Sequence, residues 1–83
     1  MIMIYGNSNC TWCEKAKQLA EQYELKYEYK SIKDPENLRD LVALIPNATT
    51  IPQIIWDNRI IGGYMDFAAE IENTIGGFGD GKI

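Results

Sequence analysis

The pattern of hydrophobic and polar positions predicts the first three elements of the chain. Residues 1–5 are apolar on both faces and end at Gly6, which is typical of a strand in a sheet that is covered on both sides. In residues 11–23 the apolar positions recur at steps of three and four, which predicts an amphipathic helix. Residues 25–32 alternate aromatic or β-branched residues with polar ones and predict a second strand.

A second helix is predicted to begin at Asp34 and Pro35. The Asp34 carboxylate can accept a backbone N–H bond as the N-cap, and Pro35 suits a first turn, where its missing N–H would have no helical partner. Four apolar residues mark the course of this helix: Leu38, Leu41, Val42 and Ile45. We expect the helix to stop at Pro46.

The remaining elements are a hairpin and a last helix. Residues 51–56 and 59–61 have the composition of strands, with Asp57-Asn58 as a turn between them and Gly62-Gly63 as the end of the second. Asp66 can cap the last helix. The inner face of this helix would carry Phe67, Ala68, Ile71 and Ile75.

The predicted order of elements is therefore β-α-β-α-β-β-α. Strands joined through a helix pair in parallel, whereas a tight turn joins antiparallel strands. The expected fold is an α/β thioredoxin-like sandwich with a four-stranded mixed sheet flanked by helices. The 83 residues are too few for two separate cores, which predicts one domain over residues 1–83, with a flexible glycine-rich tail at 76–83.

Composition and charge narrow the functional classes. The net charge is -4 and the chain has no basic cluster, which excludes nucleic-acid binding because phosphate recognition needs several Lys or Arg on one face. No apolar stretch approaches the roughly 20 residues that span a bilayer, and no secretory signal precedes the cysteines. We therefore expect no membrane partner and a cytoplasmic location, where two cysteines three positions apart are catalytic or metal-binding rather than a permanent crosslink.

Cys10 and Cys13 are the candidate catalytic residues. Cys10 lies where the first strand passes into the first helix, so free backbone N–H groups should stabilise its thiolate, which is the nucleophilic form. Cys13, one turn further on, is expected to be buried and to attack a mixed disulfide formed on Cys10. The chain has no histidine, which excludes a cysteine-histidine hydrolase and a complete zinc site within one chain. The alternative is that both cysteines are small buried apolar residues, but their place at a strand-to-helix junction favours redox chemistry.

Three separated motifs make the sequence resemble the short dithiol glutaredoxins. The first motif, at residues 5–13, is YGNSNCTWC; the second, at residues 50–54, is TIPQI; the third, at residues 61–67, is IGGYMDF. The resemblance covers nearly the whole chain, from Ile4 to about Ile75. It implies thiol-disulfide exchange with glutathione as the co-substrate.

The resemblance also implies a set of glutathione-binding residues. In the family the proline of the second motif is cis, which implies a cis Ile51–Pro52 bond facing Cys10 and an Ile51 backbone that is offered to an extended peptide. The Gly62-Gly63 turn would let the chain approach the ligand, and Asp66 with the first N–H groups of the last helix would hold the charged γ-glutamyl end. The expected binding residues are Asn7, Thr11, Trp12, Thr50, Ile51, Pro52, Gly63, Tyr64, Met65 and Asp66, and no metal is expected.

Three residues depart from the usual pattern of the family. Asn7 stands where glutaredoxins commonly have Lys or Arg, which weakens a charged contact with the glycine carboxylate of glutathione. Thr11 replaces the common proline after the first cysteine. Trp12 replaces the more usual tyrosine and can still flank the ligand.

The leading functional hypothesis is a monomeric enzyme that reduces glutathione mixed disulfides and protein disulfides and is restored by two glutathione molecules. The resemblance implies ribonucleotide reductase as one electron acceptor. A second hypothesis is a redoxin that is reduced by thioredoxin reductase. It remains open because Asn7 weakens the expected contact with glutathione. A third hypothesis is a carrier of a [2Fe-2S] cluster that two chains share through Cys10 and two glutathione thiols. It remains open because the family members that do this include ones with a residue other than proline after the first cysteine, as Thr11 is here.

Overall fold

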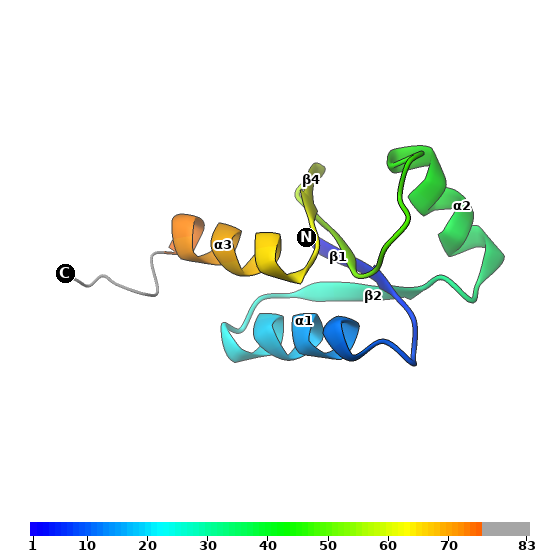
Figure 1. The fold of residues 1–83 in the computed structure, drawn as a ribbon. Coiled ribbons are helices and arrows are strands. Elements are labelled where there is room, and N and C mark those ends of the chain that lie inside the picture. The colour runs from blue at the N-terminus through cyan, green and yellow to red at the C-terminus, as the bar shows by residue number, and fades with distance from the viewer. Residues whose placement is uncertain (76–83) are drawn as a thin grey trace.

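The fold follows the predicted order of elements (Figure 1). The computed structural model describes residues 1–75, except for the side chain of Ile75, and the predicted flexible tail at 76–83 lies outside the described residues. The elements are β1 (Ile2–Gly6), α1 (Thr11–Gln22), β2 (Tyr27–Ser31), α2 (Pro35–Leu44), β3 (Gln53–Trp56), β4 (Arg59–Gly62) and α3 (Tyr64–Ile75). Within residues 1–75, no helix has both the length and the apolar character needed to cross a bilayer.

The four strands form one mixed sheet in the order β2-β1-β3-β4. β1 pairs in parallel with β2, so that Ile4 lies beside Tyr29, and it pairs antiparallel with β3 on its other side. β3 and β4 are antiparallel. The predicted parallel pair and the predicted hairpin are both confirmed, and β1 lies in the interior of the sheet, as its apolar sequence requires.

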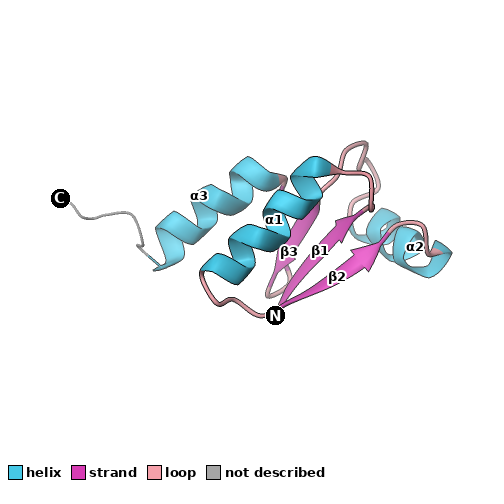
Figure 2. Ribbon diagram, turned by 90° about the horizontal axis from the view of Figure 1, so that it is seen from below, coloured by secondary structure: helices cyan, strands magenta, loops and turns pink. Residues whose placement is uncertain are grey.

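Two clusters of side chains cover the two faces of this sheet. On one face, Ile2 and Ile4 of β1 pack with side chains of α1 and α3, and Figure 2 shows these two helices side by side along the strands. On the other face, Tyr5 packs with Leu41 of α2 and Ile55 of β3. Figure 2 also places α2 near the carboxyl ends of β1 and β2, which is the end of the sheet where the chain enters α1.

The second helix begins as predicted but is covered less than its sequence pattern suggests. Asp34 is the N-cap and accepts a hydrogen bond from the Glu36 N–H. Leu41 is buried, whereas Leu38 is 43% and Val42 48% exposed. The helix ends at Leu44 rather than at Pro46, because a residue that precedes proline is driven out of the helical region and Ile45 has φ -133° and ψ 84°.

The hairpin differs from its predicted bounds at both ends. Its turn is confirmed, since Asp57 and Asn58 both have the positive φ of a two-residue I′ turn. β3 begins at Gln53 rather than at residue 51, because Pro52 has no N–H to donate to a neighbouring strand. β4 continues through Gly62, one residue further than expected.

Candidate active site

Cys10 is the N-cap residue of α1. Its backbone is extended, with φ -108° and ψ 110°, and its Sγ accepts a hydrogen bond of 3.1 Å from the Cys13 N–H. This confirms that the first cysteine lies at a helix N-terminus. Backbone N–H groups and the positive end of a helix dipole favour a thiolate at such a position, so this helix end can favour the ionised form of a reduced Cys10 without a histidine.

Cys13 lies one turn inside α1 and has no exposed surface. The two cysteines are joined by a disulfide, with their Cα atoms 5.2 Å apart. The room for Cys13 comes from Gly6 at the end of β1, because a Cβ at Gly6 would lie 2.6 Å from the Cys13 Sγ. Cys10 is thus partly exposed, whereas Cys13 is fully buried, as the sequence predicted.

The loop before β3 lies against Cys10. The Ile51–Pro52 bond is cis, as the resemblance implied, and the Ile51 carbonyl oxygen lies 3.9 Å from the Cys10 Sγ. The Gln53 side chain donates hydrogen bonds to the carbonyl and hydroxyl oxygens of Thr50, at 3.0 and 3.2 Å. These bonds restrain the loop and so help to hold the Ile51 backbone beside the Cys10 Sγ.

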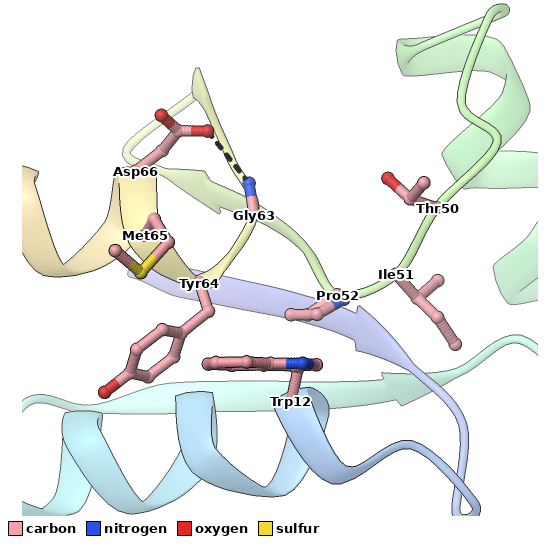
Figure 3. A pocket seen from close by; sticks show the side chains of 8 residues that line it. All are labelled: Trp12, Thr50, Ile51, Pro52, Gly63, Tyr64, Met65 and Asp66. Atoms are coloured by element: carbon pink, nitrogen blue, oxygen red, sulfur yellow. Dashed lines mark hydrogen bonds between the residues drawn. The ribbon is translucent and has the colours of Figure 1, made fainter.

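A pocket of about 350 Å³ lies next to this loop (Figure 3). The Trp12 and Tyr64 rings are 5.2 Å apart between centroids and form one side of the pocket. Its lining consists of eight of the ten expected binding residues: Trp12, Thr50, Ile51, Pro52, Gly63, Tyr64, Met65 and Asp66. The three sequence motifs, far apart along the chain, therefore meet at one place.

Asn7 and Thr11 do not line this pocket. The Asn7 carbonyl oxygen accepts hydrogen bonds from the Tyr29 hydroxyl and the Cys10 N–H, at 3.1 and 3.2 Å, and its side-chain oxygen accepts one from the Ser8 N–H. Thr11 is exposed at the first position of α1. The backbone of Asn7 thus holds the loop that carries Cys10, while its side chain is engaged next to its own backbone.

The predicted role of Asp66 as the N-cap of the last helix is wrong. α3 begins at Tyr64 and Gly63 occupies the cap, since its carbonyl accepts the first helical hydrogen bond from the Phe67 N–H at 2.9 Å. Asp66 lies inside the first turn, where its carboxylate accepts a 3.3 Å hydrogen bond from the Gly63 N–H (Figure 3). Aspartate is favoured both at the N-cap and in the first turn, where its charge complements the helix dipole, so the sequence does not distinguish the two positions.

The two glycines of the turn before α3 have unequal roles. Gly62 has φ +119°, and a Cβ there would collide with the Asp66 carboxylate. A Cβ on Gly63 would meet only the Pro52 carbonyl oxygen, at 3.8 Å. Gly62 is therefore the position that requires glycine, because any side chain there would displace the Asp66 carboxylate from the turn.

Tyr29, Lys15 and Lys17 are neighbours of the site that the sequence did not point out. Burial raises the pKa of Tyr29 above its ordinary value, although the Lys17 ammonium opposes this, so the hydroxyl remains protonated and donates to Asn7. Lys17 lies over the Tyr29 ring and Lys15 over the Trp12 ring, each 4.4 Å from the centroid. The alternation in β2 was the only sequence signal for Tyr29, and it identified a strand rather than a site.

Comparisons with known proteins agree with this geometry. The sequence model of the Glutaredoxin family matches residues 2–61. The chain is 34% identical over 82 residues to Glutaredoxin 1 of Escherichia coli, across 88% of this chain and 94% of the relative. It is 35% identical over 78 residues to Glutaredoxin-1 of vaccinia virus (strain Copenhagen), across 87% of this chain and 71% of the relative. The solved structure of reduced E. coli glutaredoxin has a TM-score of 0.76 at 34% identity, covering 90% of this chain and 96% of that one.

A thioredoxin-like fold with two cysteines in a C-x-x-C arrangement at the start of its first helix defines a thiol-disulfide oxidoreductase. Within that class, the family match and the relatives leave one assignment. The chain belongs to the glutaredoxin family.

Proposed function

We propose that this protein uses glutathione to reduce glutathione mixed disulfides and protein disulfides. One observation carries the proposal: the pocket lined by Trp12, Tyr64 and Asp66 opens at the same Ile51 backbone that lies 3.9 Å from the Cys10 Sγ. A small peptide whose cysteine reacts at Cys10 can therefore place its neighbouring residue in this pocket. The γ-glutamyl end of glutathione suits the lining, because the Asp66 carboxylate can pair with its ammonium group and free N–H groups at the start of α3 can meet its carboxylate.

Each reaction transfers two electrons, through Cys10 alone when the substrate is a glutathione mixed disulfide and through both cysteines when it is a protein disulfide. With a glutathione mixed disulfide, the Cys10 thiolate attacks the glutathione sulfur, the protein thiolate leaves, and a second glutathione then removes the glutathionyl group as glutathione disulfide. With a protein disulfide, Cys10 forms a mixed disulfide with the substrate and Cys13 displaces it, leaving the Cys10–Cys13 disulfide. Two glutathione molecules reduce that disulfide and become glutathione disulfide.

The wider setting is proposed on the family resemblance and on the composition of the chain. We infer a cytoplasmic protein that works as a monomer, and ribonucleotide reductase is proposed as one acceptor of its electrons. Glutathione is a co-substrate in this scheme, and no resident metal takes part.

An assay of NADPH oxidation with a glutathione mixed-disulfide substrate tests the proposal. One arm supplies glutathione and glutathione reductase, and the other supplies thioredoxin reductase without glutathione. We expect turnover in the first arm and little in the second. Efficient turnover with thioredoxin reductase alone would instead support the redoxin hypothesis.

A further inference from the structure

A second, smaller pocket lies on the other side of the loop that carries Ile51. It has a volume of about 200 Å³ and is bounded by Ile32, Leu38, Leu41 and Ala48, together with the loop itself. Thr50 and Ile51 line both pockets. Figure 3 shows the Ile51 side chain pointing away from Trp12 and Tyr64. The loop therefore separates two depressions, and its Ile51 carbonyl oxygen lies 3.9 Å from the Cys10 Sγ.

The size and chemistry of this second pocket suit one apolar side chain. Pockets for small molecules are typically about 300–1,000 Å³, and this one is smaller. No charged residue lines it, and threonines are its only polar lining residues. One of its walls, Leu38, is 43% exposed, so an incoming aliphatic side chain would remove apolar surface of both partners from water.

The direction of a bound substrate identifies which side chain would enter. This step rests on the proposed function, in which the γ-glutamyl residue of glutathione occupies the larger pocket and its cysteine meets Cys10. The residue before that cysteine occupies the larger pocket, so the residue after it leaves on the opposite side of Ile51, which also lines the second pocket. An extended chain advances about 3.3–3.6 Å per residue, so one or two residues suffice to reach that pocket. In glutathione the residue after the cysteine is glycine, which has no side chain and leaves the pocket empty.

We propose that the second pocket binds an apolar side chain that follows, within two residues, the reacting cysteine of a protein disulfide substrate. The occupant is thus a segment of a substrate protein, and the pocket is continuous with the reaction site through Thr50 and Ile51. It distinguishes protein disulfides from glutathione mixed disulfides, which react at the same Cys10. It also favours those protein disulfides in which a leucine, isoleucine, valine, methionine or phenylalanine follows the cysteine.

Short peptides that carry a 2-thiopyridyl disulfide on their single cysteine test this proposal without glutathione. The Cys10 thiolate of the reduced protein attacks the peptide sulfur and releases pyridine-2-thione, whose absorbance gives the rate; Cys13 then displaces the peptide as a thiol. Three peptides are compared: one with leucine in the two positions after the cysteine, one with alanine in those positions, and one with the leucines before the cysteine. We expect the first to react about fivefold to tenfold faster at limiting concentration, because partial burial of one aliphatic side chain corresponds to a factor of this size.

Leu38→Gln removes an apolar wall of the pocket at a half-exposed position, so the variant should fold. Leu44→Gln is the matched control, because Leu44 is on the same helix, is 45% exposed and lines neither pocket. We expect Leu38→Gln to reduce the preference for the first peptide to less than about twofold and to leave the rate with the alanine peptide and with a glutathione mixed disulfide unchanged. Leu44→Gln should behave as the unmodified protein does.

Three results would overturn the proposal. Equal rates for the three peptides with the unmodified protein would show that the pocket takes no substrate side chain. Parallel losses with every substrate in Leu38→Gln would show a general structural effect. A dimer in sedimentation that Leu38→Gln alone dissociates, with peptide preference intact, would show that a second copy of the chain covers this face. Because the peptide reaction needs no glutathione, a failure of glutathione turnover would refute the proposed function separately.

Discussion

Replacement of Asp66 by asparagine separates the ligand-binding role proposed for this carboxylate from its structural one. Asp66 is exposed on the pocket, and one of its oxygens accepts a hydrogen bond from the Gly63 N–H at 3.3 Å. The asparagine side chain keeps an acceptor for that N–H and loses the negative charge. The cost in folding should therefore be no more than about 1 kcal/mol, the usual value of a favourable charge in a first helical turn.

The expected effect on glutathione use is larger. A hydrogen bond to a charged group is worth about 1.5–3 kcal/mol when it is removed, and exposure to solvent places this contact at the lower end of the range. We expect the KM for glutathione to rise about tenfold in Asp66→Asn. kcat should change less, because the carboxylate is far along the ligand from the sulfur that reacts.

The assay is the glutathione-coupled NADPH oxidation, accompanied by urea denaturation of each variant. Glu72→Gln serves as the control, since it removes the same charge from an exposed position of α3 that does not line the pocket; it should leave the KM unchanged. Asp66→Ala should match the asparagine variant in KM and be less stable, because it also loses the bond to Gly63. A KM unaffected in Asp66→Asn, with stability lowered, would leave Asp66 only a structural role at the start of the helix.

The remaining predictions concern the cysteines, a packed glycine and a tyrosine. Cys10→Ser should abolish all turnover, whereas Cys13→Ser should keep much of the deglutathionylation and lose most protein-disulfide reduction; iodoacetamide followed by mass spectrometry should find Cys10 modified first. Protein purified anaerobically should be mainly colourless and monomeric, and a visible glutathione-dependent chromophore lost in Cys10→Ser would favour the cluster carrier. Gly6→Ala should lower the free energy of unfolding by about 1–3 kcal/mol in urea denaturation, because its Cβ would lie 2.6 Å from the Cys13 Sγ, whereas Gly63→Ala should cost less. The hydrogen bond from the Tyr27 hydroxyl to the Glu21 carboxylate raises the pKa of Tyr27 to about 12. This hydrogen bond should therefore stabilise the fold fully below about pH 10 and lose its effect as the pH rises toward 12. A urea midpoint that falls over this pH range as much in Tyr27→Phe as in the unmodified protein would contradict this.

Local signals in the sequence were sufficient for the elements that carry the chemistry. The C-x-x-C after a strand-length apolar run placed Cys10 at the start of α1, and the resemblance correctly implied the cis bond before Pro52. These features depend on residues that are close together in the chain or on motifs with a fixed backbone geometry. The same motifs supply the eight expected residues that line one pocket, and the predicted order of the elements brings these motifs together.

Features that depend on contacts between distant segments were missed. The bond from Tyr29 to the Asn7 carbonyl joins residues 22 positions apart and depends on the register of β1 against β2, which no local pattern specifies. The apolar periodicity of residues 38–45 correctly predicted the helix α2, but it does not determine how much of the helix is covered by the sheet. Leu38 and Leu41 have the same apolar character in the sequence, and only the tertiary packing leaves one half-exposed and buries the other.

The fixed position of Cys10 has a consequence for how substrates are distinguished. Its sulfur is held between the Cys13 N–H and the Ile51 carbonyl, so every incoming disulfide must bring its own sulfur to the same point and in a similar orientation. Chemistry at that point is common to all substrates, and selectivity has to come from what lies on either side of the reacting cysteine. The loop ending at Ile51 contributes to both neighbouring pockets. In the proposed scheme we therefore expect that substitutions around this loop change the preference between a glutathionyl group and a protein segment without touching the two cysteines.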